Sequence, residues 1–148
     1  MTAQVENDKI YWGGYGRSAQ WNSARNKGKN VRHGETDILQ AHGISAPEDF
    51  AYFTDCTNKA VYGHGAEQVK MTRGISDRGS LRDCSTQAEL LLLALHEKAV
   101  KDEIEKSGAY GRKQIEAVYE KAGKALLEVE ASRPSLRRPF KGLFYCLI

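Results

Sequence analysis

The stretch of sequence that decides the fold is TQAELLLLALHEKAVKDEIEKSGAYGRKQIEAVYEKAGKALLEVEAS, residues 86–132. Thr86 and Glu89 have the spacing of a capping box, and neither proline nor glycine interrupts the next turns, which predicts a helix over 86–107. After a glycine-containing turn, apolar residues recur three and four positions apart, which predicts a second helix over 111–132. The sequence therefore predicts a helical hairpin.

Outside this hairpin, short runs of β-branched, aromatic and other apolar residues predict strands near 9–12, 60–63, 67–72 and 140–148. These strands and the hairpin predict an α+β fold, in which a small mixed or antiparallel sheet packs against two helices. A length of 148 residues is typical of one domain, here expected to span 1–148. Because the last run is almost entirely apolar, we expect it to lie centrally in the sheet or to pair in a homo-oligomer.

The composition, 41% hydrophobic and 28% charged with a mean hydropathy of -0.57, is typical of a folded, water-soluble protein. The N-terminal residues do not follow the pattern of a signal peptide, and no apolar run is long enough to span a membrane. The 3 cysteines are too few for a disulfide framework, which favours a cytoplasmic location. Histidines and cysteines lack metal-site spacing, so we expect neither a metal nor a cofactor.

The charge distribution is uneven, because the segment 9–34 contains no Asp or Glu although the chain carries a net charge of only +3. The basic and aromatic residues expected to bind there are Tyr11, Trp12, Tyr15, Arg17, Trp21, Arg25, Lys27, Lys29 and Arg32. Ser18 and Gly28 would begin and end a helix within this segment. Cationic side chains that contact phosphates and aromatic rings that stack on bases predict binding of RNA, DNA or a nucleotide. If Trp12 and Trp21 are instead buried, the cations form only a solvated rim.

A second hypothesis concerns the run 82–85, Arg-Asp-Cys-Ser, directly before the predicted hairpin. A helix N-terminus favours the thiolate form of a nearby cysteine. The run resembles the Asp-Cys-Ser element around the nucleophile of NlpC/P60-type papain-like cysteine hydrolases. The resemblance implies that Cys84 is the nucleophile of a cysteine-dependent hydrolase or transferase, with His64, His42 or His33 upstream as the base, as in circularly permuted relatives. An inert, buried thiol is the alternative interpretation.

A third hypothesis is a protein-interaction or inhibitor module without catalysis. Exposed tryptophans would then supply the residues that dominate the binding energy of a protein interface. The positions of Trp12 and Trp21 therefore decide whether the basic segment is a binding surface, with both side chains facing solvent, or a solvated rim, with both buried.

Overall fold

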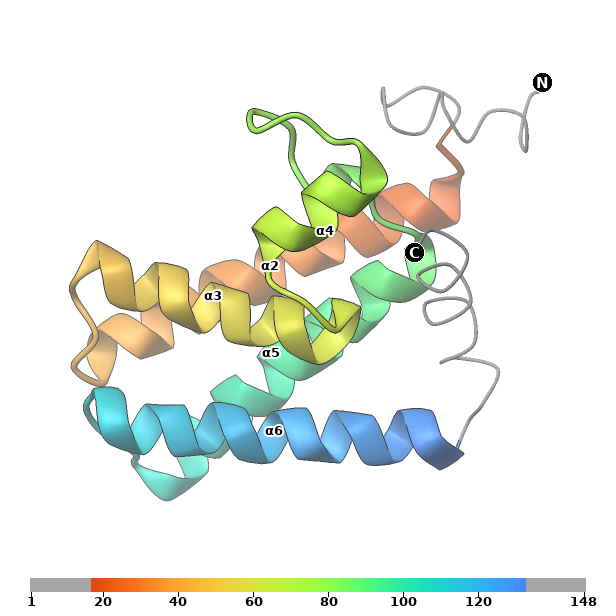
Figure 1. Ribbon diagram of the computed structural model, residues 1–148. Coiled ribbons are helices and arrows are strands. Elements are labelled where there is room, and N and C mark those ends of the chain that lie inside the picture. Colours follow the sequence, from red (N-terminus) through yellow and green to blue (C-terminus); the bar gives the residue numbers. More distant parts are fainter. Residues whose placement is uncertain (1–16, 133–148) are drawn as a thin grey trace.

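The computed structural model describes residues 17–132, and this part of the chain is built from helices joined by short turns (Figure 1). In chain order the elements are α2 (Ala19–Ala41), α3 (Pro47–Tyr62), α4 (Ala66–Arg73), the 3₁₀ turn η1 (Arg82–Cys84), α5 (Gln87–Ser107) and α6 (Arg112–Ser132). Helix α5 contacts α2, α3 and α6, and α3 also contacts α4. Residues 17–132 contain no strand, so the prediction of an α+β fold with a sheet is wrong for this part.

The two helices predicted from the opening stretch, over 86–107 and 111–132, are confirmed as α5 and α6. At the start of α5, the Glu89 amide donates to Thr86 Oγ1 at 3.1 Å, and the Thr86 amide donates to Glu89 Oε1 at 3.0 Å. These reciprocal bonds satisfy amide groups that have no partner within the helix. At the other end, Gly108 adopts a left-handed conformation with φ of 72°, which closes α5 before the turn to α6.

Helix α2 is longer than the sequence predicts. It begins at the expected cap, where Ser18 accepts a hydrogen bond from the amide of Trp21, but it continues past Gly28 to Ala41. A glycine inside a helix costs about 1 kcal/mol relative to alanine, an amount that tertiary packing can outweigh. Because α2 packs along α5 and Gly28 is buried, the helix continues instead of ending there.

The strands predicted at 60–63 and 67–72 are helical in the structure. Residues 60–62 form the last turn of α3. The buried residues of this helix recur three and four positions apart, the spacing of a helix face and not of a strand, and they are Phe53, Thr57, Asn58, Val61 and Tyr62. Residues 67–72 belong to α4, in which Val69 is the one buried residue. The predicted strands at 9–12 and 140–148 lie outside the described residues, as does the homo-oligomer contact expected of the latter.

The core consists of two apolar clusters separated by buried polar residues. The first cluster comprises Ala24, Val61, Tyr62, Val69, Leu81, Leu90, Leu92, Leu93 and Leu126. The second cluster comprises Leu39, Ile44, Phe53, Val100, Ile104, Ala109, Ile115, Val118 and Tyr119. Between them along α3 and α5 lie Thr57, Asn58, His96 and Glu97, which together with Glu35 of α2 we call the polar layer. The functional site described below opens beside this layer.

None of the helices within residues 17–132 combines the length and the apolar character needed to cross a bilayer. Leu91 and Leu95 of α5 are about half exposed, at 46% and 50%, so the apolar start of α5 is not buried on every side.

Candidate functional site

A cleft of about 450 Å³ lies between α2, α3, α4 and the loop that leads into η1. Its lining residues are Arg25, Lys29, Arg32, His33, Thr36, Thr54, Asn58, Ala66, Lys70, Ser80, Leu81 and Arg82. Five of these carry a permanent positive charge, and none is Asp, Glu, Phe, Tyr or Trp. We refer to this hollow as the basic cleft.

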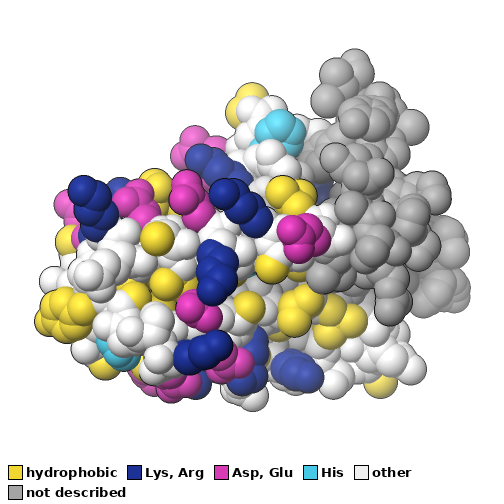
Figure 2. All heavy atoms as spheres, turned by 90° about the horizontal axis from the view of Figure 1, so that it is seen from below, with side chains coloured by type: hydrophobic (Ala, Val, Ile, Leu, Met, Phe, Trp, Pro, Cys, Tyr) yellow, Lys and Arg dark blue, Asp and Glu magenta, His cyan; other side chains and the backbone are white. Residues whose placement is uncertain are grey.

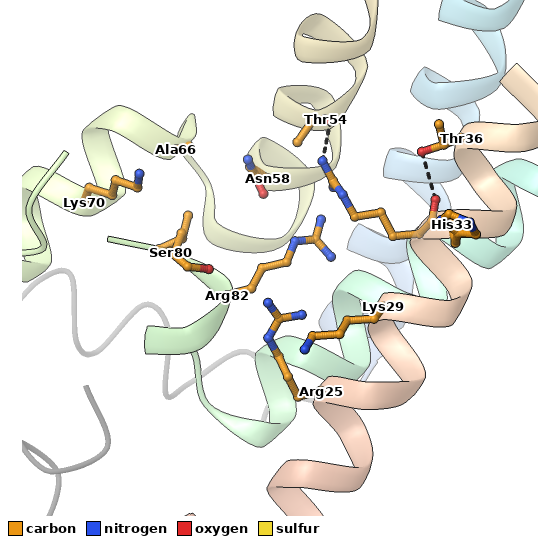
Figure 3. A pocket seen from close by; sticks show the side chains of 12 residues that line it. Arg25, Lys29, His33, Thr36, Thr54, Asn58, Ala66, Lys70, Ser80 and Arg82 are labelled. Atoms are coloured by element: carbon orange, nitrogen blue, oxygen red, sulfur yellow. Dashed lines mark hydrogen bonds between the residues drawn. The ribbon is translucent and has the colours of Figure 1, made fainter. Parts of the chain in front are cut away.

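Helix α2 supplies three of the five cations. Arg25, Lys29 and Arg32 are spaced four and three residues apart, which places them on one face of a continuous helix. Figure 3 shows Arg25 and Lys29 extending from α2 toward Arg82 of η1, while Lys70 reaches toward the hollow from α4. The cleft therefore brings together cations from three separate segments of the chain.

The arginines of the cleft are held in place by hydrogen bonds. Arg25 Nε donates to Asp83 Oδ1 at 2.8 Å. Arg82 donates through Nη1 and Nη2 to the two carboxylate oxygens of Glu97, at 3.3 and 2.7 Å. Arg32 donates through Nη2 to Thr54 Oγ1 at 3.1 Å, and its Nη1 lies 3.4 Å from Glu97 Oε2. Such fixed guanidinium groups are suited to bidentate recognition of phosphate.

The two lysines are not neutralised in this way. Lys29 is exposed and has no ion pair or hydrogen bond to another residue of the 17–132 segment. Lys70 Nζ lies 3.4 Å from the backbone carbonyl oxygen of Asp77, and this carbonyl group carries no charge that would neutralise the lysine. The carboxylates that contact the lining residues are Asp83, Glu97 and Asp55, the last through the amide groups of Asn58 and Ala66. Five cations thus face three carboxylates, and positive charge is in excess.

The polar layer carries a second buried carboxyl group next to Glu97. Glu35 is 4% exposed and accepts a hydrogen bond from the hydroxyl of Tyr119. Burial raises the pKa of Glu35 to about 7, and the charge of Glu97 adds to this effect, while the hydrogen bond from Tyr119 and the charges of Arg32 and Arg82 oppose it. The inner wall of the basic cleft therefore borders a carboxyl group that titrates near neutral pH.

The face of the molecule shown in Figure 2 differs from the basic cleft, because its Lys and Arg side chains alternate with Asp and Glu. Ion pairs such as Lys98–Asp102 and Lys121–Glu103 illustrate this pattern for exposed cations. Pairs of this kind contribute little to stability and leave little net charge to attract an anion. On this face positive and negative side chains are mixed, whereas the lining of the cleft carries five cations and no Asp or Glu.

The structure brings together only some of the binding residues predicted from the sequence. Arg25, Lys29 and Arg32 line the cleft, whereas Lys27 is exposed on a different side of α2. Trp21 is half-buried against the first cluster, and its indole Nε1 donates to the carbonyl of Ser85 at 2.8 Å. The guanidinium of Arg17 covers its ring at 3.7 Å. Both residues are thus structural, and Tyr11, Trp12 and Tyr15 lie outside the described residues.

The geometry does not favour Cys84 as a nucleophile. The thiol is buried in η1 behind the Thr86 cap, and burial raises its pKa, an effect that the charges of Arg17 and Arg73 only partly offset. The prediction of a lowered thiol pKa is therefore wrong, because desolvation outweighs the nearby helix terminus. His64, the base assigned to it, is exposed in the turn between α3 and α4. A catalytic role for this pair stays a prediction that the geometry does not support.

The sequence did not predict several polar or charged residues of the cleft, namely Thr36, Thr54, Asn58, Lys70, Ser80 and Arg82. If the helix had been predicted to continue through Gly28, Arg25, Lys29 and Arg32 would have been recognised as one cationic face. No local pattern in the sequence, however, indicates that α3, α4 and η1 pack beside that face.

No group of three or more His, Cys, Asp or Glu side chains within residues 17–132 is arranged to hold a metal ion.

Comparison with known proteins gives no relative from which to infer an activity. No protein-family model matches this chain, and no curated protein matches it significantly. The function is therefore argued from the basic cleft alone.

Proposed function

We propose that this protein binds a phosphate-bearing anion in the basic cleft. The observation that carries the proposal is the convergence of five cations on one hollow, with Lys29 exposed and without a carboxylate partner in the described part of the chain. An excess of cations over carboxylates in one hollow raises the local positive potential and costs stability unless an anion relieves the repulsion. The fixed arginines supply the direct hydrogen bonds, and the lysines supply charge that can adjust to the ligand.

The location expected from the sequence, the cytoplasm, belongs to this proposal, since phosphate-bearing ligands are abundant there. The hypothesis of an anionic partner is retained, but the residues proposed to bind this partner differ from those predicted from the sequence. Lys70 and Arg82 join Arg25, Lys29 and Arg32, while Arg17, Trp21 and Lys27 are removed.

A thermal unfolding series tests the proposal. The full-length chain is heated with inorganic phosphate, pyrophosphate or a short oligonucleotide at increasing NaCl concentration. A ligand that binds only the folded state raises the midpoint, and salt should reduce that rise because the contact is electrostatic. Lys29→Ala should weaken binding by at least about tenfold, the value of one charge-assisted hydrogen bond.

Lys27→Ala provides a matched control, because Lys27 lies two residues away on the same helix but outside the cleft. The proposal predicts that this variant binds as the unmodified chain does. It fails if none of the three anions stabilises the protein, or if the two lysine variants lose the same affinity.

A further inference from the structure

The shape of the basic cleft restricts the size of the anion that it can hold. Its volume of about 450 Å³ lies within the range of small-molecule pockets in proteins. Arg25, Lys29 and Arg32 alone would form a row along α2, a pattern suited to an extended backbone. Lys70 and Arg82 face this row from other elements (Figure 3), so a ligand inside the hollow is surrounded by cations. A compact anion makes these contacts simultaneously, whereas an extended strand contacts one side at a time.

The lining also lacks the large aromatic side chains that usually form a stacking platform for a nucleobase. None of the residues that line the cleft is Phe, Tyr or Trp, and the one ring among them is the exposed imidazole of His33. Trp21 is the one tryptophan within residues 17–132. Its indole nitrogen donates to the Ser85 carbonyl, and the guanidinium of Arg17 covers the face of its ring. Proteins that bind single-stranded nucleic acids generally combine cationic grooves with aromatic stacking platforms. The described cleft has the first of these features without the second.

The neutral residues of the cleft match the oxygens of a phosphate chain. Thr54 already accepts a hydrogen bond from Arg32, and its hydroxyl hydrogen is available to a phosphate oxygen. Ser80 adds a second hydroxyl from the loop before η1. Hydroxyl and guanidinium donors that line the same hollow can therefore bind successive phosphate groups. The excess of cations over carboxylates requires a ligand with several negative charges, which a monoanion does not provide.

We propose that the ligand is a compact polyphosphate, either an inorganic one or the polyphosphate tail of a nucleotide, bound without recognition of the base. This inference rests on the proposed function, since it names the class of anion for the same cleft. It differs from the sequence hypothesis, in which aromatic residues of the segment 9–34 stack on bases. Its distinctive consequence is that affinity follows the number of linked phosphates.

Isothermal titration of the full chain with a series of anions tests this inference in buffer without divalent cations. The probes are orthophosphate, pyrophosphate, tripolyphosphate, AMP, ATP, GTP and a ten-residue oligothymidylate. We expect affinity to rise at least tenfold from orthophosphate to tripolyphosphate, with AMP close to orthophosphate. ATP and GTP should agree within threefold. Tripolyphosphate binding tighter than both nucleotides would identify the inorganic chain as the ligand, whereas equal or tighter nucleotide binding would identify the nucleotide tail.

Variants separate this cleft from other cationic surfaces. Lys29→Ala and Lys70→Ala should each weaken tripolyphosphate binding by about tenfold, and the double variant should weaken it further, because the two lysines lie on different elements of the cleft. Lys27→Ala should bind normally. Circular dichroism and the thermal midpoint of each variant without ligand establish that it is folded.

Three results would overturn the inference while leaving the proposed function intact. The first is orthophosphate binding as tightly as tripolyphosphate. The second is a difference of more than threefold between ATP and GTP. The third is oligothymidylate binding more tightly than tripolyphosphate. The last two require contacts beyond the phosphate chain. If no anion in the series binds, the proposed function fails together with the inference.

Discussion

Two glutamates of α5, Glu89 and Glu97, are each 1% exposed and paired with arginine, yet their surroundings differ. Glu89 accepts hydrogen bonds from both terminal nitrogens of Arg73, whose side chain is only 5% exposed. Glu97 is shared by Arg82 and Arg32, whose side chains are 13% and 38% exposed and line the cleft. The Glu89 site is closed, and the Glu97 site is open on the side of its cations.

This difference separates an ion pair enclosed by the fold from one whose cations line a cleft. At the closed site, burial opposes the charge of Arg73, but the hydrogen bonds and charge of Glu89 outweigh it and raise the pKa of Arg73. At the open site, guanidinium groups held by Glu97 keep donors that a second anion can reach. The carboxylates of the two sites are equally buried. The sites differ in the solvent exposure of their arginines.

The largest effect is expected at the closed site. Glu89→Gln leaves the Arg73 charge buried without a counter-charge, which should lower the free energy of unfolding by about 3–5 kcal/mol. Urea denaturation followed by circular dichroism measures this loss. Asp102→Asn, which breaks the exposed pair with Lys98, is the control and should cost less than about 1 kcal/mol. Equal losses in the two variants would show that the closed site is not special.

The next effect depends on pH and concerns Glu35, beside the open site. Its pKa of about 7 in the folded chain exceeds the ordinary value of 4.5, so protonation favours the folded state. The resulting stability is fully present below pH 4.5 and is lost as the pH rises through 7. Glu35→Gln should therefore gain stability relative to the unmodified chain between pH 5 and pH 8, by on the order of 3 kcal/mol. Urea titrations at both pH values measure it.

His96 in the same polar layer has the opposite effect on the pH dependence of stability, and the experiment must separate it from the effect of Glu35. Burial lowers its pKa to about 4 from 6.5, although the backbone of Tyr119 opposes the shift. The unfolded state therefore takes up a proton first as the pH falls, and stability decreases from pH 6.5 toward pH 4. Since His96 is present in both chains, the comparison with Glu35→Gln cancels its effect. A difference between the chains that does not change with pH would contradict the role of Glu35.

A smaller effect is expected when the open site loses its carboxylate. Glu97→Gln should lower the free energy of unfolding by about 1–3 kcal/mol, less than Glu89→Gln, because Arg32 and Arg82 can still reach solvent. Tripolyphosphate should restore part of this stability and bind more tightly than to the unmodified chain. Denaturation with and without this anion measures both effects. A loss as large as that of Glu89→Gln, unaffected by tripolyphosphate, would remove the distinction between the sites.

The smallest effect is expected at the cap of α5. Thr86→Ala removes the acceptor of the Glu89 amide and should cost about 0.5–2 kcal/mol. Anion binding should be unchanged, because Thr86 does not line the cleft. Thermal unfolding and the tripolyphosphate titration together test both statements, and weakened binding would mean that the closed site also influences the open one.

The sequence predicted the parts of the fold whose causes are local. The Thr86 capping box and the repeating apolar positions of α6 are short-range signals, and both helices are present. The pieces 60–63 and 67–72 were predicted as strands because each is too short to show a helical period by itself. In the structure α3 continues from Phe53 into the first piece, and Asp55 accepts from the amide of Ala66 at the start of α4. Support of this kind comes from residues outside each short piece, so it leaves no pattern within the piece itself.

The site was predicted in part for the same reason. Arg25, Lys29 and Arg32 were found because they are dense in the sequence, whereas Lys70 and Arg82 are brought to them only by the packing of α4 and η1. The role of Trp21 was not predictable from its type, since an indole can stack on a ligand or donate to a buried carbonyl as it does to Ser85. Composition identifies the cations, and tertiary structure decides which of them meet.

The division of the core into two apolar clusters by a polar layer determines how this sequence can diverge. Residues such as Leu93 and Val100 can exchange with other apolar side chains of similar volume at little cost. Changes at Glu97 should be coupled to changes at its arginine partners, and changes at Glu35 to changes at Tyr119. Distant relatives of this chain should therefore be recognisable by linked substitutions in the polar layer, long after the apolar positions have lost resemblance.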